Sequence, residues 1–148
     1  MDATPNAMET GFRLQLTAEL KDLPEIQQFV SQSLAALRAD PVAEPDILLA
    51  VTEIVTNTLT HGYRNKPGWV EILIRRNGDS LQIVLRDKAV PFDPTQVPDP
   101  DVHLPLKERL PGGLGIYLAR HFVDHIVYRT TPEYGNEIIL VKNGILGA

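Results

Sequence analysis

The sequence contains no cysteine, a single tryptophan and no long run of lysine and arginine. The absence of cysteine excludes disulfide bonds, thiolate metal sites and cysteine nucleophiles. The formal net charge of −5 disfavours direct nucleic-acid binding, because neutralising phosphates requires a basic surface. No apolar run reaches the length of a membrane span, and residues 1–10 lack the basic and apolar regions of a signal peptide. We therefore expect a cytoplasmic protein with no membrane partner.

The composition of the 148 residues is typical of one globular domain. Apolar residues make up 43 % and charged residues 22 %, so the chain can bury a substantial core. Residues 1–10 are polar and are expected to form a flexible N-terminus. Residues 11–148 show no internal repeat and no linker, and they are predicted to form a single domain.

The stretch from Asp46 to His61 predicts a helix with one side in the core. Its core-facing positions are Ile47, Val51, Ile54, Val55 and Thr58. Glu53 and Asn57 lie one turn apart on the flank of this side, and His61 continues the polar band. A carboxylate and a carboxamide at this spacing can converge on one ligand, although solvated surface positions produce the same pattern.

Alternating and helical spacings predict the other elements. Strands are expected at residues 12–16, 69–76, 81–87, 126–131 and 137–142. Helices are expected at residues 24–38 and after the Gly112–Gly115 run, and the central helix should end near Gly62 in a left-handed cap. This order predicts an α+β fold, a two-layer α/β sandwich whose mixed, mostly antiparallel sheet carries helices on one face.

Three features of the sequence point to one nucleotide site. The first is the pair Glu53 and Asn57, and the second is Asp87, which ends a buried-looking strand and can accept a hydrogen bond from an amino group. The third is the Gly112–Gly115 run, because glycines at a helix start let backbone amides approach an anion, although structural turns also use them. An asparagine beside phosphates suits Mg²⁺, and neither the Walker nor the Rossmann glycine motif is present. We predict an unconventional site for ATP and Mg²⁺, with Asn57 as the metal ligand.

Three segments of the sequence resemble the bacterial anti-sigma-factor serine/threonine kinases. They are E-I-V-T-N-T-L-T-H-G-Y, R-D-K-A-V-P-F-D-P and P-G-G-L-G-I-Y-L-A-R-H-F-V-D. The resemblance extends from Arg13 to Lys142 and includes the wider superfamily of DNA gyrase, histidine kinases and heat-shock chaperones. It implies the Bergerat-type ATP-binding fold, with residues 88–112 as a mobile lid over the nucleotide.

The resemblance also implies roles for individual residues. Glu53 matches the general base, Asn57 the Mg²⁺ ligand and Asp87 the reader of adenine. Further nucleotide contacts are expected at His61, Ala89, Phe92, Gly112, Gly113, Leu114, Gly115 and Asn136. The implied function is an ATP-dependent kinase that phosphorylates an anti-sigma-factor antagonist and sequesters a sigma factor. The resemblance also allows a homodimer.

One departure from the family pattern keeps a second function open. The family has Asp-x-Gly after the strand, whereas Ala89 places a methyl group at the glycine position. The alternative is a non-catalytic regulatory module that binds a protein partner and has a degenerate nucleotide site. A third alternative is the isolated ATPase domain of a histidine-kinase-like phosphorelay, which the absence of a preceding phosphoacceptor helix disfavours.

Other candidate residues favour structural roles. His121 and His125 lie one helical turn apart without a third ligand nearby in the sequence, so packing or surface placement is favoured over a metal site. Trp69 is interpreted as packing against the sheet rather than as a ligand platform. The acidic residues Asp93, Asp99 and Asp101 are interpreted as solvated, with contact to a partner as the alternative.

Overall fold

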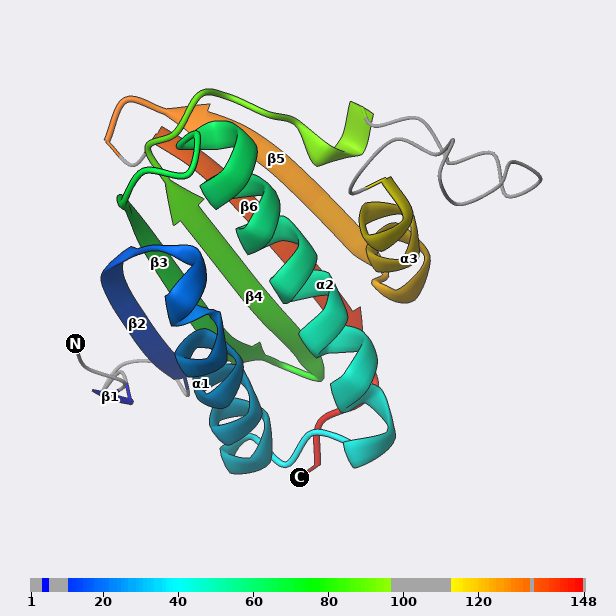
Figure 1. Cartoon of the computed structure of the whole chain (residues 1–148). Helices are drawn as coiled ribbons and strands as arrows, with labels where there is room; N and C mark the ends of the chain where they lie inside the picture. Colours follow the sequence, from blue (N-terminus) through cyan, green and yellow to red (C-terminus); the bar gives the residue numbers. More distant parts are fainter. Residues whose placement is uncertain (1–3, 6–10, 97–112, 134, 148) are drawn as a thin grey trace.

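The computed structural model describes residues 4–5, 11–96, 113–133 and 135–147. These residues form one sheet in the order β1-β2-β3-β4-β6-β5, and every strand pairing is antiparallel. The strands are β1 (Thr4–Pro5), β2 (Gly11–Ala18), β3 (Gly68–Asn77), β4 (Ser80–Asp87), β5 (His125–Thr131) and β6 (Gly135–Asn143). The predicted α+β class is confirmed (Figure 1).

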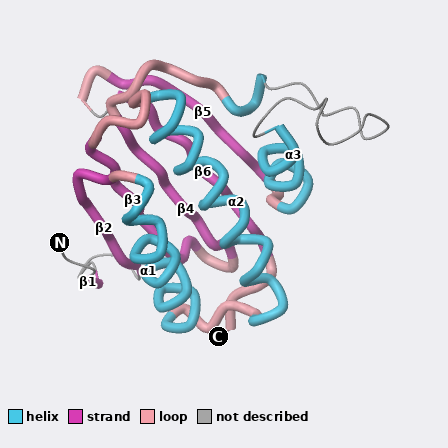
Figure 2. The backbone as a smooth tube through the Cα atoms, in the orientation of Figure 1, coloured by secondary structure: helices cyan, strands magenta, loops and turns pink. Residues whose placement is uncertain are grey.

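The helices α1 (Leu23–Ala36), α2 (Glu44–Asn57) and α3 (Gly113–Phe122) lie together on one face of the sheet (Figures 1 and 2). Helix α2 crosses the middle of the sheet between the other two, and its apolar side is buried as the helical spacing predicts. The core forms where this side meets Ile72, Ile83 and Leu140 on the sheet. Among the described residues, no helix is both long and apolar enough to cross a bilayer.

The other face of the sheet carries a row of charged side chains. Strand register aligns Glu71, Arg86, Glu137 and Arg129 across β3, β4, β6 and β5. Arg86 bridges the two carboxylates, with distances of 2.8 Å to Glu71 and 2.7 Å to Glu137. Glu71 and Glu137 are 2 % and 1 % exposed, and the arginine bonds compensate their desolvation. The row thereby cross-links four strands.

The end of α2 differs from the prediction. Gly62 does not adopt a left-handed conformation; the helix continues as a π-helical turn, Thr58–Gly62, and the positive φ angles fall at Arg64 and Asn65. The backbone of Gly62 instead approaches the segment after β4, since a Cβ atom placed on it would lie 2.6 Å from the Cβ atom of Ala89. Glycine is therefore required here for close packing rather than for its φ angle.

Two predictions about chain organisation extend beyond the described residues. Thr4–Pro5 pairs with Phe12 and Arg13 of β2, while the division into a flexible N-terminus and one domain stays a prediction. Residues 97–112 of the predicted lid and Gly112 of the glycine run lie outside the described residues.

Candidate nucleotide site

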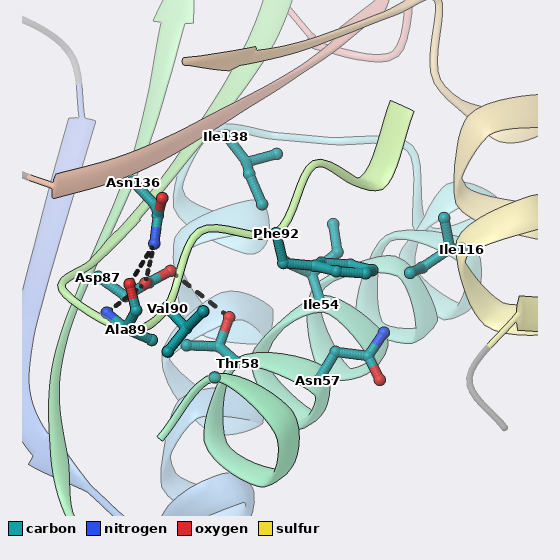
Figure 3. A pocket seen from close by; sticks show the side chains of 11 residues that line it. Ile54, Asn57, Thr58, Asp87, Ala89, Val90, Phe92, Ile116, Asn136 and Ile138 are labelled. Atoms are coloured by element: carbon teal, nitrogen blue, oxygen red, sulfur yellow. Dashed lines mark hydrogen bonds between the residues drawn. The ribbon is translucent and has the colours of Figure 1, made fainter. Parts of the chain in front are cut away.

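A cleft lies between α2, the end of β4 and the first residue of α3 whose side chain is described. It encloses about 350 Å³ of empty space, part of it open to solvent. Its lining residues are Ile54, Asn57, Thr58, Gly62, Asp87, Ala89, Val90, Phe92, Ile116, Asn136 and Ile138 (Figure 3). An apolar cleft with a few convergent polar groups is typical of a small-molecule site.

Asp87 is the buried charged group of this cleft, with 6 % of its surface exposed. Its Oδ1 atom accepts hydrogen bonds from the backbone amide of Ala89 at 2.9 Å and from Nδ2 of Asn136 at 2.8 Å. Within the described residues, its Oδ2 atom receives only a long contact of 3.5 Å from the Thr58 hydroxyl. Burial raises the pKa of Asp87, while the bonds from Asn136, Ala89 and Thr58 oppose that rise. Oδ2 therefore keeps capacity to accept a hydrogen bond from a ligand.

The segment after β4 is fastened by its backbone on two sides. The Tyr63 hydroxyl accepts the amide of Lys88 at 2.7 Å and donates to the carbonyl of Trp69 at 2.6 Å. On the other side, Nδ2 of Asn136 donates to the carbonyl of Ala89 at 2.9 Å. The start of the predicted lid is thus held against the sheet.

Ala89 tolerates its methyl group without backbone strain. The non-glycine residues with positive φ in the described chain are Arg38, Arg64 and Asn65, so Ala89 does not need the conformation that favours glycine. Its methyl group packs against Gly62, where a side chain is absent. The departure from the family glycine therefore leaves the hydrogen bonds of Asp87 intact.

Helix α2 contributes Asn57 at the opposite end of the cleft. Figure 3 shows its side chain directed away from Asp87. Glu53, one turn earlier, is half-buried and lies outside the cavity lining, and His61 is exposed and also lies outside it. Of the residues predicted to contact the nucleotide, the structure brings Asn57, Asp87, Ala89, Phe92 and Asn136 to one cleft.

The glycine run opens α3 as predicted. Gly113, Leu114 and Gly115 form its first residues, and Ile116, the next residue, lines the cleft. The amino terminus of a helix carries partial positive charge and unpaired amides, which attract phosphate.

The donor chemistry at Asn57 fits Mg²⁺, which accepts one side-chain oxygen together with phosphate oxygens and water. No group of three histidine, cysteine or acidic residues within the described ranges is arranged to hold a metal by itself. His121 instead contacts the backbone oxygen of Tyr117 at 2.9 Å through Nδ1 and packs against its ring. Trp69 lies outside the cavity lining, and the ammonium group of Lys88 sits 5.3 Å from its ring centre.

The sequence patterns missed several residues that support the site. Thr58 was expected in the core stripe, but it is half-buried and its hydroxyl faces Asp87. A hydroxyl among apolar helix positions was the available signal. Gly62 was predicted only as a helix cap, and Tyr63 and Tyr128 were given no role, because the roles of all three arise from contacts with distant strands and loops.

The pattern of the histidine kinase-like ATPase domain family matches residues 16–142, most of the chain. The chain belongs to this family. It is also similar to curated proteins named anti-sigma F factor. The relative from Clostridium kluyveri is 27 % identical over 120 residues, which cover 78 % of this chain and 84 % of the relative. The relative from Bacillus licheniformis is 28 % identical over 141 residues, covering 92 % and 94 % of the two chains.

Family membership confirms the resemblance that the three sequence segments carry. An ATPase domain implies that the protein binds ATP. The roles of Glu53, Asn57 and Asp87 stay predictions, since the family match concerns the domain as a whole.

Proposed function

We propose that this protein is an ATP-dependent serine/threonine kinase of the anti-sigma-factor type, which phosphorylates an antagonist protein and sequesters a sigma factor. The observation that carries the proposal is the buried Asp87, whose Oδ2 atom retains acceptor capacity in a cleft with Asn57 at its other end. The similarity to proteins named anti-sigma F factor supports the choice of partners.

The base of the nucleotide occupies the end of the cleft near Asp87. The ionised carboxylate accepts a hydrogen bond from the amino group of adenine through Oδ2, because Oδ1 is already occupied twice. The side chains of Ile54, Ile138 and Phe92 supply apolar surface for the planar ring. Guanine presents an oxygen at the position of the adenine amino group, so the carboxylate disfavours GTP.

The phosphates occupy the end of the cleft where Asn57 and α3 lie. Asn57 offers its side-chain oxygen to Mg²⁺, and the metal neutralises charge on the phosphate oxygens when it is bound. The amides at the start of α3 supply further donors to the phosphates, since Ile116 in the first turn of this helix lines the cleft. Glu53 takes the proton of the serine or threonine hydroxyl while the hydroxyl oxygen bonds to the γ-phosphorus. The bond from that phosphorus to the bridging oxygen breaks, and ADP leaves.

Two measurements test this function. A ligand at a hundred times its dissociation constant adds about 2.7 kcal/mol to the free energy of unfolding. For a domain of this size, we expect Mg-ATP to raise Tm by about 5–10 °C. The second measurement is transfer of the radiolabelled γ-phosphate to purified candidate antagonists, with Glu53→Gln as the matched control. No change in Tm at millimolar Mg-ATP would refute the kinase and favour the non-catalytic module.

A further inference from the structure

A chain of hydrogen bonds runs from Asp87 away from the cleft and into the sheet. Nδ2 of Asn136 donates to Oδ1 of Asp87 at 2.8 Å and to the carbonyl of Ala89 at 2.9 Å. Oδ1 of Asn136 accepts the Tyr128 hydroxyl at 2.8 Å. A carboxamide has two N–H donors, and both are used here. Asn136 is 4 % exposed, so it has no donor left for a nucleotide although it lines the cleft.

Tyr128 ends this chain of hydrogen bonds and fixes the orientation of the Asn136 side chain. Its hydroxyl donates to Oδ1 of Asn136, which leaves Nδ2 of Asn136 directed toward Asp87 and Ala89. Burial raises the pKa of Tyr128, and the charges of Asp93 and Asp87 act in the same direction, so the hydroxyl stays protonated and able to donate near neutral pH. The Ala89 carbonyl is thus held by Asn136, whose side chain is in turn oriented by Tyr128.

The strand register brings these side chains together. Asp87 of β4 is paired directly with Asn136 of β6, and Thr130 of β5 is paired with Asn136. Tyr128 lies two residues from Thr130, which places it on the same face and diagonal to Asn136, within reach of a long side chain. The three interacting groups therefore come from three neighbouring strands on the helix-covered face.

We propose that Asn136 and Tyr128 are positioning residues for base recognition. By occupying Oδ1 of Asp87, Asn136 leaves Oδ2 as the oxygen that meets the amino group of adenine. This inference rests on the proposed function and deepens it, because it explains which oxygen of Asp87 selects ATP over GTP.

The first experiment measures dissociation constants for Mg-ATP and Mg-GTP by titration calorimetry. Asn136→Ala should weaken ATP binding about tenfold or more, since it removes the hydrogen bonds from Asn136 to Oδ1 of Asp87 and to the Ala89 carbonyl. Tyr128→Phe should weaken ATP binding about threefold, and the preference for ATP over GTP should fall in both variants. Tyr117→Phe is the matched control, because Tyr117 lies on α3 outside the cavity lining. It should leave both constants unchanged.

A double-mutant cycle shows whether the pair acts through Asp87. In the Asp87→Asn background, neither Asn136→Ala nor Tyr128→Phe should change ATP affinity further. If the increases in the ATP dissociation constant caused by Asp87→Asn and by Asn136→Ala multiply in the double variant, Asn136 contacts the base directly. That result would overturn the inference. Wild-type protein that binds ATP and GTP equally would also overturn it.

A measurement without nucleotide separates this inference from the proposed function. Asn136→Ala should accelerate hydrogen exchange of the Ala89 amide about tenfold in NMR spectra, because Asp87, which accepts this amide through Oδ1, loses the bond from Asn136 that holds it. The Lys88 amide, held by Tyr63, should exchange as in the wild type and serves as the internal control. Unchanged exchange at Ala89 would refute the positioning of Asp87 by Asn136. A wild-type protein that binds neither nucleotide would refute the function, whereas unchanged selectivity in the variants of an ATP-binding protein would refute only the inference.

Discussion

The contact between Gly62 and Ala89 predicts a destabilising substitution with a specific rescue. A Cβ atom at Gly62 would lie 2.6 Å from the Cβ atom of Ala89, so one of the two segments must move by about 1 Å to restore an ordinary contact. The Ala89 segment resists this movement, because Asp87 and Asn136 bind its backbone. Gly62→Ala should therefore lower both stability and affinity for ATP.

The magnitude follows from two opposing effects. Overpacking costs about 1–3 kcal/mol, and replacing glycine in a helical turn returns up to about 1 kcal/mol. We expect a net loss of about 1–2 kcal/mol, which lowers Tm by about 2–8 °C for a domain of this size.

The double variant Gly62→Ala/Ala89→Gly provides the rescue. With the Ala89 methyl removed, the nearest other atom to the new Cβ is the carbonyl oxygen of Val90 at 4.0 Å, an ordinary distance. The glycine is transferred from one position to the other, so the stability should return to within about 1 kcal/mol of the wild type. Ala89→Gly alone should cost about 0.5–1 kcal/mol and leave ATP affinity unchanged, since Ala89 has no positive φ to relieve.

Differential scanning fluorimetry of the four proteins, with and without Mg-ATP, measures these effects. A Gly62→Ala variant as stable as the wild type would refute the reasoning. A double variant no more stable than Gly62→Ala would do the same.

Three further substitutions test the site and the sheet. Glu53→Gln should reduce phosphoryl transfer about 10²- to 10⁴-fold with nucleotide binding unchanged; an undiminished single-turnover rate would remove Glu53 from the mechanism. Asp87→Asn should cost about 1–3 kcal/mol of ATP binding and lower the preference over GTP, which calorimetry measures. Because burial raises the pKa of Asp87, wild-type affinity should fall on acidification at a higher pH than for an exposed aspartate. Glu137→Gln should destabilise the fold by about 1–3 kcal/mol at pH 7 in urea titrations. Burial raises the pKa of Glu137, but bonds from Arg86 and Arg129 outweigh it and lower the pKa, so the difference from wild type should shrink below the ordinary value of 4.5. A difference that is constant with pH would contradict this ion-pair account.

Local spacing in the sequence was sufficient to predict the elements and the main polar groups of the site. The helical period of α2 places Asn57 beside the apolar side, and the alternation in β4 places Asp87 at a strand end. These relations are set by backbone geometry over a few residues, so they can be read without the fold. The glycine run at the start of α3 could be predicted for the same reason, because the exposure of backbone amides at a helix start depends only on neighbouring residues.

The tertiary structure alone decided how these groups are supported. Asn136 meets Asp87 across 49 positions of sequence, and the approach of Gly62 to Ala89 joins a helix end to a loop. Such contacts depend on strand order and register, and the insertion of β6 between β4 and β5 is not encoded by any local period. The cap predicted at Gly62 was wrong for the same reason: the packing of the neighbouring segment, rather than the φ angle, requires glycine there.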